Sequence, residues 1–203
     1  MSAGHRIAIL VLAAGQSRRM GARNKLLLRL PSGKTILRAV LEQAVEADAG
    51  PVVMVTGHER ELVAREAAGL PVRGADAPDY REGLAASLRA GLAAVPEACA
   101  GALICLGDMP FVTAATLRAL CAAFAPEAGR DIVQPVFEGR PGNPVLWGRR
   151  HFAVMSCLRG DEGARSLLED RMATLCRLEV ASTCVLEDID TPEQFQSCLQ
   201  RLG

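Results

Sequence analysis

An uninterrupted apolar run at residues 7–11, IAILV, constrains this chain more than any other feature. A short run of this kind is typical of a strand buried on both faces, as in a parallel sheet covered by helices. Amphipathic segments separate further apolar runs through the first 136 residues. This alternation predicts an α/β fold with a mostly parallel sheet, and 203 residues suit a single domain, 1–203. The further runs lie at 52–55, 102–106 and 132–137.

The loop that follows the first run has the composition of an anion-binding site. Gly15 lets the backbone approach a ligand closely because it has no Cβ, and Ser17 offers a hydroxyl. Main-chain N–H groups and fixed cations at the carboxyl end of a strand form a cradle for phosphate. The loop matches neither GxxxxGK[ST] nor GxGxxG, so a solvated basic turn is the alternative. Its cations are Arg18, Arg19, Arg23 and Lys25.

Three aspartates are candidates to complete this site. Asp108 follows the apolar run at 102–106, at the edge of the sheet where α/β folds bind ligands. A carboxylate buried there needs a cation, and magnesium is commonly held by one aspartate, waters and phosphate oxygens. The alternative for Asp108 is a helix cap. Asp188 and Asp190 precede a helix, where a carboxylate is favourable even without a ligand.

Helix caps and breakers define the remaining elements. Thr35 and Thr113 each precede an amphipathic segment, and Thr191 with Pro192 and Gln194 forms a complete capping box. The pattern predicts further helices at 59–67, 84–94, 151–158 and 164–170, strands at 70–73, 145–147 and 175–180, and turn-rich loops at 74–83 and 138–144.

Composition and charge exclude several classes of protein. Lys plus Arg equals Asp plus Glu at 23 each, and aromatics make up 3%, so we expect neither nucleic-acid nor membrane binding. Seven cysteines without CxxC spacing indicate free thiols in a reducing compartment rather than a zinc site. Without a signal-like or membrane-spanning stretch, a cytoplasmic location is expected. His58 and His151 lack partners at a catalytic spacing and are expected to be surface or packing residues.

Six pieces of sequence, taken in order, resemble a known family. They are LAAGQSRRMG with the NKLL that follows, EGLAASLRAGL, GDMPFVT, GNPVLW, GDEGAR and DIDTPE, and they extend over residues 7–195. On these pieces the chain resembles the MobA-like nucleotidyltransferases, specifically their molybdenum cofactor cytidylyltransferase branch. LAAG with a following serine resembles the cytidylyl branch, whereas guanylyl relatives more often have LAGG. The resemblance implies a Rossmann-like three-layer domain with a mixed sheet, of the nucleotide-diphospho-sugar transferase type.

The resemblance also implies roles for particular residues. Arg19, Lys25 and Asp108 would be catalytic, with Arg19 and Lys25 holding the phosphates. Asp108 would bind Mg²⁺ together with one aspartate of the pair Asp188 and Asp190, and Asp190 is preferred. The nucleotide-binding residues would be Leu12, Ala13, Ala14, Gly15, Ser17, Gly83 and Ser87.

Two positions depart from the family's pattern. Ala77 stands where members often have Asn, which bears on the contacts to the nucleotide. Asn143 stands where many relatives have His, which bears on the acceptor side.

The implied reaction moves CMP from CTP to the terminal phosphate of molybdopterin or its molybdenum form. An oxygen of that phosphate attacks the α-phosphorus and pyrophosphate leaves in line, so positioning and charge neutralisation carry most of the rate. The phosphate is already ionised, so no general base is needed. A chaperone of molybdoenzyme maturation is a further implied partner. The alternatives are a transferase with another NTP or a sugar or small-molecule phosphate as acceptor, and a non-catalytic nucleotide or cofactor carrier.

Overall fold

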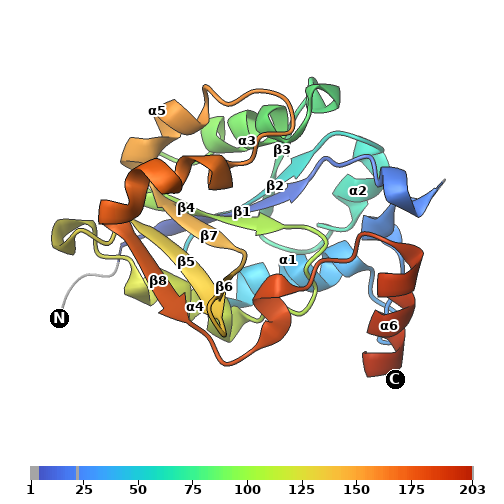
Figure 1. Cartoon of the computed structure of the whole chain (residues 1–203). Coiled ribbons are helices and arrows are strands. Elements are labelled where there is room, and N and C mark those ends of the chain that lie inside the picture. Colours follow the sequence, from blue (N-terminus) through green and yellow to red (C-terminus); the bar gives the residue numbers. More distant parts are fainter. Residues whose placement is uncertain (1–4, 22, 203) are drawn as a thin grey trace.

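A computed structural model of the chain describes residues 5–21 and 23–202, with the side chains of Arg18 and Leu202 outside that description. One mixed sheet forms its centre, in the order β3-β2-β1-β4-β7-β5-β6, with β8 paired to β5 (Figure 1). The first four strands are parallel, and β7 runs antiparallel to both β4 and β5. The strands are Ile7–Ala13, Val52–Thr56, Val72–Asp76, Gly101–Leu106, Ile132–Phe137, Arg140–Pro141, Val145–Gly148 and Leu175–Glu179.

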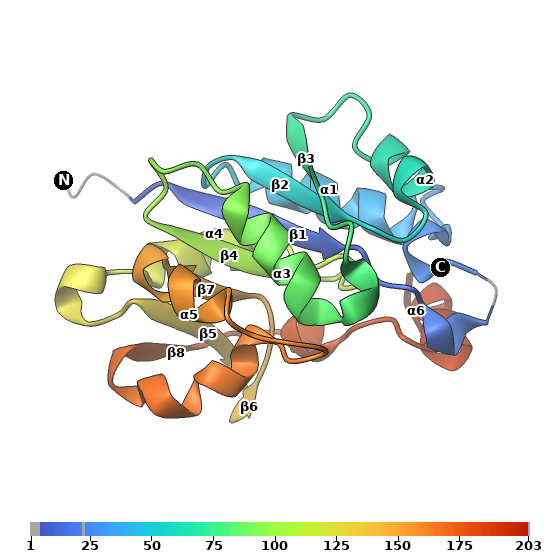
Figure 2. The same ribbon diagram turned by 90° about the horizontal axis from the view of Figure 1, so that it is seen from above.

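Helices cover both faces of the sheet, so the domain has three layers (Figures 1 and 2). Side chains such as Leu41 of α1 and Leu120 of α4 pack on one face. Leu88 of α3 and Met155 of α5 pack on the other face. Because helices cover it on both sides, β1 is buried along its whole length, as its continuous apolar run predicts. The helices are α1 Ile36–Glu46, α2 Arg60–Arg65, α3 Leu84–Ala93, α4 Ala114–Ala123, α5 Phe152–Met155 and α6 Pro192–Leu202.

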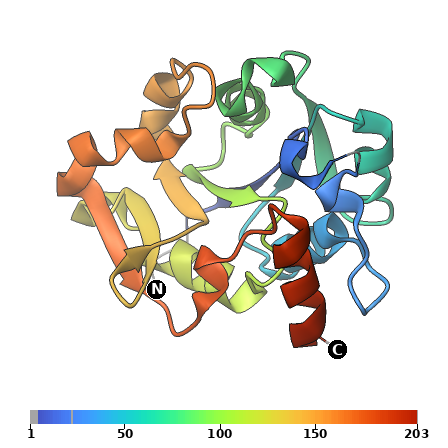
Figure 3. The same ribbon diagram turned by 45° about the vertical axis from the view of Figure 1, so that its right-hand side comes forward.

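The three threonine caps predicted from the sequence are confirmed. Each threonine hydroxyl accepts a hydrogen bond from the backbone N–H three residues later, at 3.1 Å for Thr35 and 3.3 Å for Thr113 and Thr191. The Gln194 side chain in turn accepts from the N–H of Thr191 at 2.9 Å, which completes the capping box of α6. A small cluster that includes Leu30, Ile36, Ile189 and Cys198 then holds α6 near the loop that follows β1 (Figure 3).

Two predictions about elements are wrong. The third strand was expected at 70–73 with a loop from 74, but β3 extends to Asp76. This strand lies at the edge of the sheet and is largely exposed, so it needs no apolar run. The helix expected at 164–170 is a pair of 3-10 segments, Ala164–Leu167 and Glu169–Thr174, because only Ala164 and Leu168 are buried there. Two buried positions are too few to stabilise a regular amphipathic helix.

All seven cysteines are free thiols. Burial raises the pKa of Cys121 to about 12, and burial raises the pKa of Cys105 as well. No described helix combines the length and apolar composition needed to cross a bilayer.

Candidate nucleotide and metal site

The loop after β1 folds back on itself so that Lys25 points into the site. Ser17 adopts a left-handed conformation (φ 51°), and its hydroxyl accepts the N–H of Lys25 at 3.1 Å. Asn24 caps the 3-10 turn Lys25–Leu27, because its side chain accepts the N–H of Leu26 at 3.1 Å. Leu26 is buried in the core and anchors this turn. Ser17 therefore shapes the loop in addition to lining the site.

Lys25 joins carboxylates from two distant parts of the chain. Its ammonium group donates to Asp108, just beyond β4, and to Asp190, just before α6. The Arg19 guanidinium lies 2.6 Å from the other oxygen of Asp190. The side chains of Lys25, Asp108 and Asp190 are only 13–16% exposed, whereas Arg19 is 68% exposed. The structure thus brings together the four residues for which the sequence predicted catalytic or metal roles.

Asp188 joins this cluster, so both aspartates of the DID segment lie at the site. One carboxylate oxygen from each of Asp108, Asp188 and Asp190 falls within 4.8 Å of the others. Ile189 between them is buried, and its N–H donates to the carbonyl of Asp108 at 3.0 Å, which fixes the segment against the end of β4. Asp190 was expected in preference to Asp188 as the second metal ligand, but the structure places both carboxylates beside Asp108.

The cluster has the donors that a divalent cation requires. Three carboxylates supply hard oxygen ligands. The buried Oδ1 of Asp108 has no hydrogen-bond partner among the described residues. An unpaired buried acceptor in an acidic cluster is costly without a cation, so the residues present fit a divalent ion.

The pKa directions follow from this crowding. Burial and the neighbouring carboxylates Asp190 and Asp108 raise the pKa of Asp188. Burial alone would raise the pKa of Asp190, but Lys25 and Arg19 outweigh it and the pKa is lowered. Burial likewise opposes the charged form of Lys25, yet the two carboxylates raise its pKa. Lys25 is therefore a fixed cation at neutral pH.

A cleft of about 480 Å³ opens beside this cluster, and we call it the main cleft. Arg19, Lys25, Asp108 and Asp190 line one part of it. Of the residues predicted to bind nucleotide, Leu12, Ala14, Gly15, Ser17, Gly83 and Ser87 line it too.

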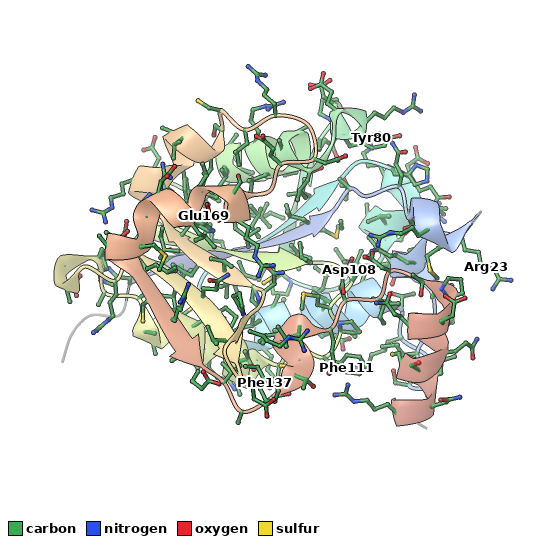
Figure 4. All side chains as sticks on the ribbon, viewed as in Figure 1. Arg23, Tyr80, Asp108, Phe111, Phe137 and Glu169 are labelled. Atoms are coloured by element: carbon green, nitrogen blue, oxygen red, sulfur yellow. The ribbon has the colours of Figure 1, made fainter. Side chains whose placement is uncertain are left out.

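Two of the described residues named in the sequence analysis, Ala13 and Arg23, do not line the main cleft. Ala13 is not among the lining residues, and its side chain packs in the core on the other face of the sheet. Arg23 points away from Asp108 into solvent (Figure 4). The side chain of Arg18 lies outside the described part of the chain.

Gly15 lies where the backbone is open to the cleft. A Cβ built on it meets no described protein atom within 4 Å, so a side chain there would obstruct a ligand rather than the protein. Gly83 differs, because its φ of 109° and the backbone of Gly160 beside it leave no room for a Cβ. The N–H of Ala85 donates to the carbonyl of Gly160 at 3.0 Å, and this bond holds the start of α3 against the segment around Gly160.

The far wall of the main cleft contains residues to which the sequence assigned no role. The 3-10 turn Tyr80–Glu82 lies at one rim, with Tyr80 apart from Asp108 (Figure 4). Asp161 lies at the same wall, with its Oδ1 2.7 Å from the position of a Cβ at Gly83. The GDEGAR piece contains Asp161, but only the fold brings it beside Gly83.

Comparison with family models matches residues 9–175 to the MobA-like NTP transferase domain. The chain belongs to this family. The family is described as NTP transferases, and the main cleft, with its basic loop and acidic cluster, has groups that suit a triphosphate and a metal ion.

Relatives within the family differ in length and name. The GlmU protein of Streptomyces griseus is 36% identical over 131 residues, but the match covers 63% of this chain and only 27% of GlmU. The purine catabolism protein PucB of Bacillus subtilis is 32% identical, with 91% of each chain covered. The molybdenum cofactor cytidylyltransferase of Escherichia coli is 29% identical, with 96% of each chain covered.

Solved structures agree with the fold. Rv0371c from Mycobacterium tuberculosis superimposes with a TM-score of 0.84 at 29% identity, covering 97% of this chain and 99% of its own. The same protein in complex with manganese gives a TM-score of 0.81 at 28% identity, covering 96% and 98%.

Proposed function

We propose that the chain transfers the cytidylyl group of CTP to the terminal phosphate of molybdopterin, or of its molybdenum form, with release of pyrophosphate. The observation that carries this proposal is the similarity to the E. coli cytidylyltransferase, which extends over 96% of both chains. The LAAG-x-Ser start of the loop, with its cations Arg19 and Lys25, favours the same branch of the family.

In this proposal the opening loop binds the triphosphate. The backbone at Ala14 and Gly15 approaches the nucleotide, while Gly83 and Ser87 line its other end. Arg19 is mostly exposed and can turn from Asp190 towards the phosphates. Together with Lys25 it would neutralise the charge that develops on the leaving pyrophosphate.

The carboxylates Asp108, Asp188 and Asp190 would hold Mg²⁺. When bound, the ion would stabilise the negative charge on the phosphate oxygens. The manganese complex of the M. tuberculosis relative supports a divalent ion in this fold. The chain's own carboxylates orient the site, because Ile189 and the cap of α6 fix their backbone.

The test is pyrophosphate release with each of the four NTPs, Mg²⁺ and molybdopterin. We expect turnover with CTP, and product that contains both cytidine and the pterin. Turnover with GTP alone, or with a sugar phosphate in place of molybdopterin, would contradict the proposal. The sugar-phosphate arm is included because a sugar or small-molecule phosphate is the alternative acceptor that the sequence leaves open.

The variant Asp108→Asn distinguishes a transferase from a carrier that binds nucleotide without reacting. This change keeps the size of the side chain and removes a metal ligand. A transferase should lose turnover by roughly 100-fold or more while its fold stays intact. Normal turnover in this variant would remove Asp108 from the mechanism.

A further inference from the structure

A second pocket of about 400 Å³ adjoins the main cleft. Leu106, at the end of β4, lines both. The acidic cluster straddles the boundary between them, because Asp108 and Asp190 line the main cleft whereas Asp188 lines the second pocket. A ligand in either space can therefore reach the same group of carboxylates.

The geometry of in-line transfer indicates where the acceptor should bind. An oxygen of the acceptor forms a bond to the α-phosphorus, while the bond from the α-phosphorus to the oxygen that bridges to the β-phosphorus breaks. The electron pair of that bond leaves with pyrophosphate, and an ionised acceptor phosphate gives up no proton. Attacking and leaving oxygens lie on opposite sides of the phosphorus. Arg19 and Lys25 mark the leaving side, in the main cleft, so the acceptor must approach from elsewhere.

We propose that the second pocket binds the acceptor as a phosphate monoester, and that Arg140 and Arg165 hold its phosphate group. This inference rests on the proposed function, because it assigns the second substrate of that reaction. It also defines the acceptor's class.

The two arginines come from different elements and converge on this pocket. Arg140 belongs to β6 and Arg165 to the 3-10 turn Ala164–Leu167. The guanidinium of Arg165 donates to the carbonyl of Pro141 at 2.9 Å, which holds it next to the backbone of Arg140. Within residues 5–21 and 23–202 neither arginine forms an ion pair with a carboxylate, so most of their N–H donors are available. Arginine forks match phosphate oxygens in geometry and charge.

The rest of the pocket wall contains both apolar and polar groups. Met109, Val185 and Leu186 are apolar, and Asn143 is the neutral polar side chain. Asn143 can form one directional hydrogen bond with the group that carries the phosphate.

The first test measures phosphate binding without any particular acceptor. The enzyme is saturated with Mg²⁺ and the non-hydrolysable α,β-methylene analogue of CTP, which fills the main cleft, and is then titrated with inorganic phosphate by calorimetry. We expect Arg140→Ala and Arg165→Ala each to weaken phosphate binding about tenfold or more. Arg73→Ala is the matched control, because Arg73 is an exposed arginine on the opposite edge strand, and it should bind phosphate like the unchanged chain. Unchanged affinity in the double variant would overturn the proposal.

The second test uses turnover with molybdopterin. The arginine variants should raise the KM for molybdopterin about tenfold and leave the KM for CTP within about twofold. A rise in the KM for CTP alone would place the arginines on the nucleotide side and refute the assignment. If Arg165→Ala unfolds because the bond to Pro141 is lost, Arg140→Ala decides, since Arg140 has no comparable bond among the described residues.

Together the two tests distinguish the proposed function from the role proposed for the second pocket. Arginine-dependent phosphate binding without any molybdopterin turnover would support the pocket and reject molybdopterin as the acceptor. Normal molybdopterin turnover in the double variant would support the proposed function and reject the pocket.

Discussion

Lys25 occupies the position between Asp108 and Asp190 that a divalent cation would also use. Its ammonium group contacts both carboxylates, and Arg19 pairs with the remaining oxygen of Asp190. A divalent ion that enters this cluster meets a cation already there. In the proposed reaction the triphosphate would bring negative charge that draws Lys25 and Arg19 away, so metal and nucleotide should bind cooperatively.

The variant Lys25→Met tests this competition. It keeps the length of the side chain and removes the charge, so Mn²⁺ binding without nucleotide should tighten roughly tenfold. Turnover should fall at the same time, because the leaving pyrophosphate loses a cation. Mn²⁺ binding is followed by electron paramagnetic resonance, and Lys34→Met, at an exposed lysine paired with Glu42, is the control. Equal Mn²⁺ affinity in the unchanged chain and in Lys25→Met would show that Lys25 does not compete with the metal.

Gly15 gives a second prediction about a single residue. Because a Cβ there meets no described protein atom, Gly15→Ala should leave the melting temperature unchanged. The methyl group would instead displace the nucleotide, and we expect the KM for CTP to rise about 10- to 100-fold. Gly74→Ala, at another glycine whose Cβ would meet no described atom within 4 Å, is the control for both measurements. A loss of stability with a normal KM would make Gly15 a structural residue.

The sequence could predict which residues gather at the site, but not which of them border the main cleft and which border the second pocket. Asp108 and Lys25 could be predicted because each follows a recognisable strand or loop signal. That Asp188 borders the second pocket while Asp190 borders the main cleft depends on how the segment around Ile189 lies against β4. Asp161 likewise becomes a cleft residue only because residues 159–163 cross beside Gly83. Such contacts between distant segments leave no local pattern.

At the scale of elements, helix α6 holds Asp190, one of the three carboxylates of the acidic cluster, in place. The helix begins at Pro192, two residues after Asp190, and its capping box fixes the backbone there. The N–H of Asp190 itself donates to the Gln194 side chain at 2.8 Å. A change that destabilises the first turn of α6 should therefore make the position of Asp190, a proposed metal ligand, less well defined.

Two threonine caps make a matched comparison. Thr191→Ala and Thr113→Ala remove caps with the same 3.3 Å hydrogen bond, and each should cost about 1 kcal/mol of the free energy of unfolding. Only Thr191→Ala should also weaken Mn²⁺ binding in the presence of CTP, because α4 does not contribute to the acidic cluster. Denaturant unfolding and metal titration measure the two effects. Equal metal affinity in both variants would uncouple the cap of α6 from the site.

Elements with a strong apolar pattern or a cap could be predicted from the sequence, and the others could not. The buried strands and the helices capped by Thr35, Thr113 and Thr191 begin where they were expected, to within a residue. The exposed edge strand β3 and the 3-10 segments after Gly163 were misplaced, because pairing to a neighbouring strand or a short covered stretch defines them. The sequence of these elements has little hydrophobic periodicity, so it does not indicate where they begin and end.

At the scale of the whole molecule, the two ends of the sheet carry different charged clusters. The site lies at the carboxyl ends of β1 and β4. At the other end, Asp131 precedes β5 and pairs with Arg150, while the ring nitrogen Nε2 of His151 lies 2.6 Å from the same carboxylate. Asp131 and His151 are both buried. This second cluster joins β5 to the segment after β7, far along the strands from the candidate site.

His151 should make the folded chain sensitive to mild acid. Burial, with Arg150 and Arg171 nearby, lowers the pKa of His151, and Asp131 opposes this only in part. In the unfolded chain the histidine regains its usual pKa near 6.5. As the pH falls through that value, the unfolded chain takes up a proton that the folded chain does not, so the free energy of unfolding decreases. His151→Gln cannot be protonated and should lose less stability than the unchanged chain between pH 7.5 and 5.5 in urea titrations. A variant that loses as much stability over this range would show that the pKa of His151 is the same in the folded and unfolded chains, so that its ion pair with Asp131 balances its burial.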